Sequence, residues 1–458
     1  MNATRADLLI TNGYVATVDG DRRELDGGWV AITGGVISGI GSSRDVPPLA
    51  DVVRDASGCL VTPGLINTHH HLYQNLTRAF PPMTNAPLFG WLQTLYPLWR
   101  ALDEESAHVS AWIGLAELAM SGCTTSTDHL YLHPRNGGDL LTAEIEAARD
   151  LGLRFHPTRG SMSLSQKDGG LPPDDVVQVD DEILALSKLA VERHHDRSFG
   201  AMVRVALAPC SPFSVTKELM VRSAELAESL DVRLHTHFAE NSEDDDFSIA
   251  TFGCRPFEYL KEVGWLSDRT WVAHCVMPNA AEIIELGRAG IGAAHCPSSN
   301  LILASGIAPV VDLRAAGVHV GLGVDGSSSA DSASLWLEAR QAMLLAKLRN
   351  GAGAADARMA LEVATIGGAG CLGRIGEIGS LQVGAVGDVA VWDLSGVQFA
   401  GAIADPVEGW LRCGPMFARD TIVHGRFVVR GGELQSKRVE EMMSAHARLS
   451  LRMQSFVG

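Results

Sequence analysis

The stretch TPGLINTHHH, residues 62–71, sets three consecutive histidines directly after a short apolar run. A buried cluster of imidazoles is poorly solvated, and its members repel one another if they are protonated. The histidines are therefore either part of a surface loop in which they have no role, or ligands of a metal ion at the end of a core strand. The rest of the sequence decides between these two interpretations.

Seven further segments resemble this stretch, because each is short and apolar and leads through polar or glycine residues into a helical pattern. With residues 62–71 they are 124–130, 153–160, 203–210, 232–240, 270–275, 291–297 and 318–326. Eight strand–helix units within about 260 residues predict an α/β fold, a distorted (β/α)8 TIM barrel over residues 62–373. An open doubly wound sheet is the alternative, but no GxGxxG motif follows the first strand to support a dinucleotide fold.

The two ends of the chain differ from this middle part. Residues 1–61 contain short alternating strands separated by glycine turns, and similar Val- and Ile-rich strands return in 379–394 and 418–434. We expect residues 1–61 and 374–458 to form one small β-sandwich domain beside the barrel, with a C-terminal tail.

Histidines and charged residues stand at the C-terminal ends of most of the predicted strands. Barrel enzymes assemble their active sites at this mouth, from loops that follow different strands. One such histidine is usually a satisfied core residue, but so many are hard to explain as structural accident. The set is His69, His71, Asp128, His129, His156, Arg159, His235, His237, Glu240, His274, His295 and Asp325.

Strand periodicity predicts that part of this set forms a metal site. Residues i and i+2 of a strand face the same side, so His69 and His71 point into the barrel while His70 points toward the helices. His237 can add a third nitrogen and Asp325 a carboxylate oxygen. Three neutral imidazoles and one carboxylate suit a divalent zinc or iron ion, with water completing the coordination shell.

These motifs resemble the amidohydrolase superfamily, in its cytosine/guanine deaminase and chlorohydrolase branch. The residues that carry the resemblance are His69-x-His71 after Pro-Gly, His237-x-x-Glu240, His274 and Val324-Asp325-Gly326. The resemblance covers nearly the whole chain and implies metal ligation by His69, His71, His237 and Asp325. Binuclear members carry a bridging carboxylated Lys at the fourth strand, which VRVALAPC (203–210) lacks. We therefore expect one divalent metal per chain, with zinc preferred and iron as the alternative.

The resemblance implies a hydrolytic deaminase, and the chemistry of the residues assigns the catalytic roles. Asp325 is expected to take the proton of the attacking water, and His274 to orient that water. Glu240 follows His237 by three residues and is expected to protonate a ring nitrogen and then the leaving amine. The H-x-E…P-C-x-x-C signature of another deaminase class is missing.

Three further stretches indicate the substrate. HHHLYQNLTRAF (69–80), RGSMS (159–163) and HCPSSN (295–300) resemble a subgroup of 8-oxoguanine deaminases, isocytosine deaminases and hydroxyatrazine-type aminohydrolases. This implies removal of the exocyclic amine of a guanine-like ring, with 8-oxoguanine as the preferred substrate and urate plus ammonia as products. Isocytosine and a triazine, in an aminohydrolase or chlorohydrolase reaction, are the alternatives. A non-catalytic scaffold is the alternative of a different class.

Gln74, Arg159 and Cys210 are the candidate substrate-binding residues. The amide of Gln74 can donate and accept, which suits a ring carbonyl beside a ring N–H, although it could also cap a helix. Arg159 could clamp a carbonyl or pair with an acid, and Cys210 could contact the base or be an inert buried thiol. The aromatic segment FGWLQTLYPLWR (89–100) could stack over a flat ring, or could be a helix packed on the barrel or at a dimer face.

Composition limits the remaining classes of function. The net charge of −17 disfavours binding to nucleic acid and anionic membranes, and the sequence shows no signal peptide and no run of about 18 apolar residues. The eight cysteines are scattered and contain no CxxC, which indicates reduced thiols. We expect a cytoplasmic homo-oligomer whose partner is a small heterocyclic substrate.

Overall fold

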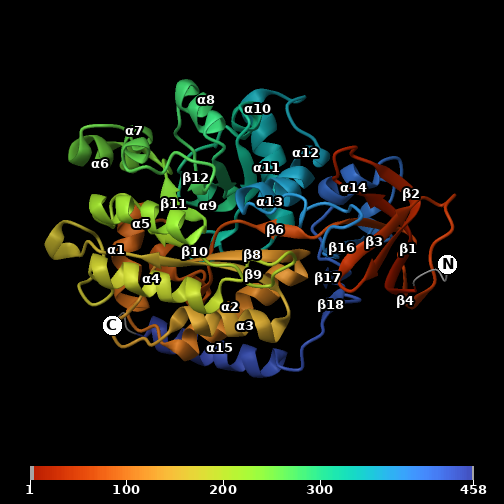
Figure 1. Ribbon diagram of the computed structural model, residues 1–458, viewed down its shortest axis with the longest axis horizontal. Coiled ribbons are helices and arrows are strands. Elements are labelled where there is room, and N and C mark those ends of the chain that lie inside the picture. The colour runs from red at the N-terminus through yellow and green to blue at the C-terminus, as the bar shows by residue number, and fades with distance from the viewer. Residues whose placement is uncertain (1–4, 456–458) are drawn as a thin grey trace.

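A closed barrel of eight parallel strands forms the centre of the molecule (Figure 1). The computed structural model describes residues 5–455. Every predicted strand segment overlaps one barrel strand, so the TIM-barrel prediction is confirmed and the open-sheet alternative is wrong. The barrel strands are β6 (Leu65–Asn67), β8 (Cys123–Leu130), β9 (Arg154–Ser161), β10 (Ala206–Pro209), β11 (Leu234–Phe238), β12 (Thr270–His274), β13 (Gly292–His295) and β14 (His319–Leu322).

Helices surround the barrel and connect its strands. The sequence sets their ends: α2 begins at the capping box of Asp103 and Ser106 and stops before Gly122, whose φ is 85°. Within the described range no helix is long and apolar enough to span a membrane. The helices are α1 (Leu88–Trp99), α2 (Glu104–Met120), α3 (Leu140–Leu151), α4 (Asp180–His194), α5 (Lys217–Leu230), α6 (Ser242–Phe252), α7 (Pro256–Glu262), α8 (Ala280–Arg288), α9 (Pro297–Ile302), α10 (Val310–Ala315), α11 (Leu335–Asn350), α12 (Ala357–Glu362), α13 (Gly368–Cys371), α14 (Pro406–Arg412) and α15 (Val439–Gln454), with the short turns η1 (Leu72–Thr77), η2 (Pro81–Met83), η3 (Gln166–Asp168), η4 (Val363–Gly367) and η5 (Val397–Phe399).

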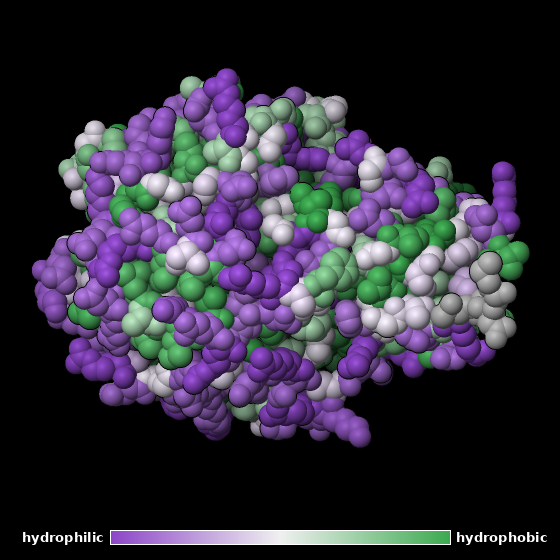
Figure 2. All heavy atoms as spheres, viewed as in Figure 1, coloured by the Kyte–Doolittle hydropathy of each residue, from purple (hydrophilic) through white to green (hydrophobic). Residues whose placement is uncertain are grey.

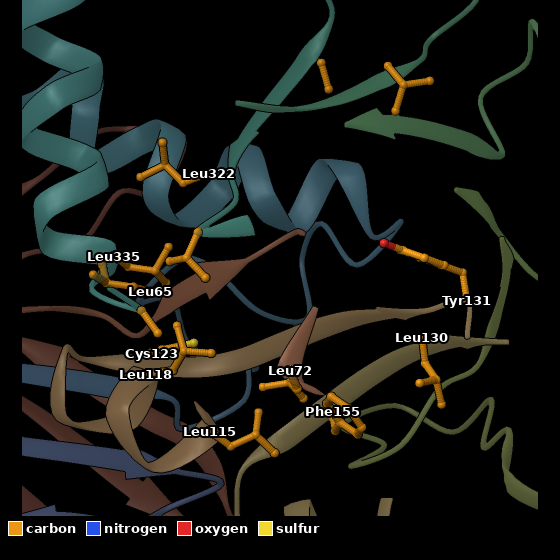
Figure 3. Packing of buried hydrophobic residues seen from close by; sticks show 14 of the residues in the cluster. Leu65, Leu72, Leu115, Leu118, Cys123, Leu130, Tyr131, Phe155, Leu322 and Leu335 are labelled. Atoms are coloured by element: carbon orange, nitrogen blue, oxygen red, sulfur yellow. The ribbon is translucent and has the colours of Figure 1, made fainter. Parts of the chain in front are cut away.

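The main hydrophobic core lies between the barrel strands and the helices. Figure 3 shows Leu115 and Leu118 of α2 in the same cluster as Cys123 of β8 and Phe155 of β9. All four side chains are fully buried. Burial of a large apolar side chain is worth about 1.5–3 kcal/mol, so this layer fixes the strands whose ends carry the polar residues.

A nine-stranded sheet lies beside the barrel and combines strands from the N-terminal and C-terminal parts of the chain, while α15 runs along α2 on the barrel (Figure 1). Antiparallel pairing of Val61 with Val391 joins the N-terminal strands to the C-terminal strands. The predicted small β domain built from both termini is confirmed, while its boundaries at residues 61 and 374 stay predictions. Its strands are β1 (Ala6–Ala16), β2 (Glu24–Thr33), β3 (Val36–Gly41), β4 (Ala50–Asp55), β5 (Cys59–Pro63), β16 (Val389–Asp393), β17 (Asp420–Val423), β18 (Arg426–Arg430) and β19 (Glu433–Leu434).

The predicted first strand, residues 62–71, is broken into three pieces. Its start belongs to β5 of the flanking sheet, β6 enters the barrel, and His70–His71 form the short β7. Gly64 makes the change of sheet possible, because a Cβ at this position would lie 2.1 Å from Thr124. β7 pairs with β15 (Asp325–Gly326), so the histidine stretch and Asp325 are adjacent through the backbone.

A buried ion pair joins the barrel to the flanking sheet. Arg154 of β9 donates from Nε and Nη2 to the two carboxylate oxygens of Asp388, at 3.1 Å each. Both side chains are almost inaccessible to solvent. Asp388 also accepts the backbone N–H of His424 at 2.8 Å, so one carboxylate holds parts of both domains.

We predict that Asp388→Asn lowers the free energy of unfolding by about 3–5 kcal/mol, because it leaves the buried Arg154 guanidinium without its counter-charge. The matched control is Glu192→Gln, which breaks the exposed pair with Lys188 and should cost less than about 1 kcal/mol. Urea denaturation of the purified variants measures both. Equal midpoints for the two variants would contradict the assignment.

Candidate metal centre

Four side chains meet at the carboxyl ends of the barrel strands: His69, His71, His237 and Asp325. The Nε2 atoms of His69 and His71 each lie 3.3 Å from Asp325 Oδ1. The Nε2 atoms of His71 and His237 are 3.2 Å apart. The sequence prediction that these residues come together is thus matched by their positions in the fold.

Backbone carbonyls determine which nitrogen of His71 and His237 carries the proton. Nδ1 of His71 lies 2.9 Å from the carbonyl oxygen of His129, and Nδ1 of His237 lies 2.7 Å from that of Cys210. A carbonyl only accepts hydrogen bonds, so both Nδ1 atoms are donors. In the neutral rings, the two Nε2 atoms that face each other both present lone pairs.

A histidine relay fixes the tautomer of His69 in the same way. Nδ1 of His235 donates to the carbonyl oxygen of Trp271 at 2.8 Å, which leaves its Nε2 as an acceptor. Nδ1 of His69 lies 2.8 Å from that acceptor and therefore donates to it. Nε2 of His69 is then a lone pair, and it is buried with no hydrogen-bond partner among the described residues.

The electrostatics of the cluster match a cation site. Burial lowers the pKa of His71, and it lowers the pKa of His69 and His237 well below the usual value, which keeps the three rings neutral. Burial acts to raise the pKa of Asp325, but its contact with His69 and the nearby imidazoles bring this pKa well below its ordinary value. Three imidazole lone pairs and a carboxylate oxygen thus converge without a proton between them, a donor set that fits a divalent metal ion.

His129 and His274 complete the surrounding histidine cluster. Ligand atoms of His129 lie within 4.8 Å of those of His69, His71 and His237. However, Nε2 of His129 donates to the carbonyl oxygen of Ala208 at 3.1 Å, so only its Nδ1 stays without a partner. His274 belongs to a second group, with His69, His237 and Asp325.

Glu240 and His274 stand next to the cluster. Nε2 of His274 lies 3.5 Å from Glu240 Oε2 and 3.9 Å from Asp325 Oδ2. Its Nδ1 lies 3.0 Å from Oδ1 of Asn300, in α9. Burial, together with the negative charge of Asp325, raises the pKa of Glu240 well above its usual value, so this carboxyl group can hold a proton to donate.

The backbone is strained at two of these residues. His274 has a φ of 69° and Asp325 a φ of 58°, both in the left-handed region that side chains other than Gly seldom occupy. Such strain costs about 1–3 kcal/mol per residue and persists where the surroundings impose it. Here it turns the two side chains toward the same point.

A narrow pocket opens over the cluster. Its floor includes His71, His237, Glu240, His274 and Asp325, and its walls include Gln74, Cys210 and Ser329. Trp91 and Tyr96 of α1 line it together with Tyr131, so the aromatic segment 89–100 is a helix that packs on the barrel and also faces the pocket. The wall of the pocket is therefore largely aromatic on this side.

Gln74 and Cys210 face this pocket, whereas Arg159 does not. Oε1 of Gln74 is buried without a partner, and Gly326 leaves space for it, because a Cβ there would lie 1.7 Å from this oxygen. Burial raises the pKa of the Cys210 thiol to about 12, so the thiol is neutral. Arg159 lines a separate hollow and binds Gln178 and Gly160, so the prediction that it clamps the substrate is not supported by its position.

The sequence did not predict the contacts of His235 with His69 and of Asn300 with His274. His235 was noted only as a residue at a strand end, although its spacing of two from His237 already placed both on one face. The contact of Asn300 with His274 joins two separate elements, and no local pattern indicates it. His156 and His295 are buried, but neither lines the pocket.

Known proteins resemble this chain over nearly its whole length. An 8-oxoguanine deaminase from Pseudomonas aeruginosa is 47% identical over 420 residues, which are 92% of this chain and 93% of the relative. A hydroxydechloroatrazine ethylaminohydrolase from Pseudomonas sp. (strain ADP) is 35% identical, with 96% of this chain and 92% of the relative covered.

Solved structures agree with the sequence relatives. The crystal structure of an atrazine chlorohydrolase from Arthrobacter aurescens TC1 complexed with zinc superposes with a TM-score of 0.91 at 33% identity, covering 97% of this chain and 100% of the other. Residues 60–425 match the Amidohydrolase family. The chain belongs to the amidohydrolase family and is a metal-dependent hydrolase that acts on carbon–nitrogen bonds.

Proposed function

We propose that this chain is a deaminase that hydrolyses 8-oxoguanine to urate and ammonia. The observation that carries the proposal is the convergence of three unprotonated imidazole nitrogens and Asp325 beside the buried carboxyl group of Glu240, at the floor of a pocket with aromatic walls. The substrate assignment is supported by the 47% identity to a deaminase of that specificity.

One divalent metal ion per chain, zinc first, is held by His69, His71, His237 and Asp325. When bound there, the ion supplies Lewis-acid chemistry that lowers the pKa of a bound water to about 7. The proposal of a single metal ion is supported by residues 203–210, VRVALAPC, because this segment around β10 contains no Lys that could bridge a second ion.

The protein residues move the protons of the reaction. Asp325 accepts a proton from the attacking water, whose oxygen adds to the ring carbon that bears the amine. His274 orients this water, and its own ring is held by Asn300. Glu240 delivers its proton to the adjacent ring nitrogen, recovers the hydroxyl proton of the adduct and passes it to the amine, so that the C–N bond breaks, a carbonyl forms and ammonia leaves. The proton that Asp325 took from water then returns to Glu240, which restores both groups.

Substrate recognition falls to the pocket wall. The buried, unpartnered Oε1 of Gln74 can accept a hydrogen bond from a ring N–H, and its amide N–H can donate to the neighbouring carbonyl. Cys210 contributes its backbone carbonyl to His237 and presents a neutral thiol to the ring.

Two other substrates use the same chemistry: isocytosine and a hydroxyatrazine-type aminotriazine. The triazine alternative is supported by the 35% identity to the ethylaminohydrolase and by the zinc-bound chlorohydrolase structure. A cytoplasmic location agrees with eight free cysteines, and homo-oligomerisation stays a prediction.

A panel of aminopurines, aminopyrimidines and aminotriazines, assayed for released ammonia, tests the function. We expect 8-oxoguanine to give the highest kcat/KM, with urate as product, and the free base to react far better than its nucleotide. Turnover of the triazine alone would contradict the purine assignment, and a metal-loaded protein without turnover on the whole panel would support a scaffold.

Metal content tests the ligand set. Elemental analysis should find one divalent metal in the wild type and almost none in Asp325→Asn, which removes an anionic ligand. His129→Gln should keep one metal, because His129 is outside the proposed ligand set and its backbone carbonyl, which holds Nδ1 of His71, is unchanged. Two metals per wild-type chain, or loss of metal in His129→Gln alone, would contradict the assignment.

The relay through His235 should control metal affinity. We predict that His235→Asn weakens metal binding by about 10–100-fold, because His69 loses the acceptor that fixes its tautomer. The matched control is His195→Asn, since His195 also bonds a backbone carbonyl, that of Val205, but lies outside the site. Competition with a chelator measures both affinities, and equal affinities would show that the relay is unimportant.

Glu240→Gln should keep the metal but lower kcat by roughly 10²–10⁴-fold, because the amide cannot deliver a proton. Glu258→Gln on the exposed face of α7 serves as the control and should keep wild-type turnover. Steady-state kinetics of both metal-loaded variants give the comparison. A Glu240→Gln enzyme as fast as the wild type would make Glu240 a structural residue.

Gln74→Ala should discriminate between substrates. A ring with a carbonyl beside an N–H should lose about 1–3 kcal/mol of transition-state binding, because its polar edge is left unpaired. An alkylaminotriazine without the carbonyl should lose much less. The measurement is kcat/KM of wild type and variant on 8-oxoguanine, isocytosine and an aminotriazine, and equal losses on all three would mean that Gln74 only shapes the loop.

A further inference from the structure

A second hollow, with a volume of about 570 Å³ and open to solvent, lies on the outside of the barrel. It is bordered by the segment 133–141 that leads into α3, by residues 177–179 and by one face of α4. None of its lining residues belongs to the pocket over the metal centre. Figure 2 shows apolar side chains exposed on the face where Figure 1 places α4.

The guanidinium group of Arg159 lines this hollow and makes no ion pair with a described carboxylate. The side chain is only 5% exposed, and the negative charges of Glu182 and Asp139 act on it from a distance. Its two hydrogen bonds go to neutral oxygens, from Nη1 to the Gly160 carbonyl and from Nη2 to Gln178 Oε1 at 2.6 Å. These use two of its five N–H groups.

Burying a charge without a partner costs free energy. The acidic side chains near Arg159 nevertheless bond to other residues. The amide nitrogen of Gln178 donates to Glu182 at 3.3 Å, which turns the amide oxygen, and not the carboxylate, toward Arg159. Asp139 at the rim is already paired with Arg193 at 3.0 Å. Both nearby acids thus have other partners, and burial lowers the pKa of Arg159 to about 10.

The lining of the hollow is partly apolar and partly charged, since Arg135 and Arg193 also border it. Leu140 and Leu141 are buried beneath it, while Val179 and Leu189 are 68% and 48% exposed. The hollow therefore combines one unpaired cation at its floor with aliphatic surface that is left in water.

We propose that this hollow binds a small organic anion with a single carboxylate on an apolar body. A planar carboxylate matches the fork of the Arg159 guanidinium, and the apolar body covers Val179 and Leu189. The site lies behind the segment 131–133. Tyr131 in this segment faces the pocket over the metal centre, whereas His133 faces the outer hollow.

Calorimetric titration of the full-length protein with 4-bromobenzoate tests this site, with neutral 4-bromobenzamide as the matched probe. We expect saturable binding of one benzoate per chain, at least 10-fold weaker binding of the amide, and at least 10-fold weaker benzoate binding to Arg159→Met. Arg288→Met, which alters an exposed arginine on α8, should bind like the wild type. Leu186→Trp fills the hollow and keeps the Arg159 charge, and it should also lose benzoate binding. This variant replaces Arg159→Met in the test if Arg159→Met does not fold.

The bromine anomalous signal in a soaked crystal locates the ligand. A peak in the hollow with the carboxylate on Arg159 is the expected result. A bromine found only at the metal centre, no binding of benzoate, or equal binding of benzoate and benzamide would overturn the proposal.

Discussion

The facing lone pairs of His71 and His237, 3.2 Å apart, are the constraint on which the rest of the site depends. Two unprotonated nitrogens at this distance repel each other unless a cation lies between them or a proton joins them. Nδ1 of each ring donates a hydrogen bond to a backbone carbonyl oxygen, so the proton of each neutral ring is on Nδ1. Burial opposes the addition of a second proton to either ring. The two nitrogens therefore match a divalent cation, and the relay from His69 through His235 adds a third nitrogen lone pair to the same donor set.

The barrel and its flanking sheet hold this arrangement from outside. The chain crosses from β5 into β6 at Gly64 and reaches the histidines within a few residues, so the position of the first ligands depends on the junction between the two domains. The buried Arg154–Asp388 pair fixes that junction from the other side. Apolar packing of α2 against β8 and β9 stabilises the fold. This stabilisation offsets the cost of the strained backbone at His274 and Asp325.

Much of this could be predicted from the sequence, because the signals are local or periodic. The alternation of His69 and His71, the strand–helix repeat and the polar residues at strand ends need only the geometry of strands and barrels. The division of residues 62–71 among three strands was not predictable, because it depends on contacts with Thr124 and with β15. Arg159 was misplaced for a related reason: it stands at a strand end, but its side chain points to the outer hollow, and spacing alone did not reveal this.

X-ray absorption spectroscopy of the metal-loaded protein tests the central claim, that one cation is held by the three Nε2 atoms and Asp325. The account predicts imidazole nitrogens and carboxylate or water oxygens at about 2.0–2.2 Å and no heavier neighbour. A sulfur scatterer at about 2.3 Å would place Cys210 in the coordination shell. A metal–metal distance of about 3.5–4 Å would replace the single ion with a pair. Either result would contradict the account.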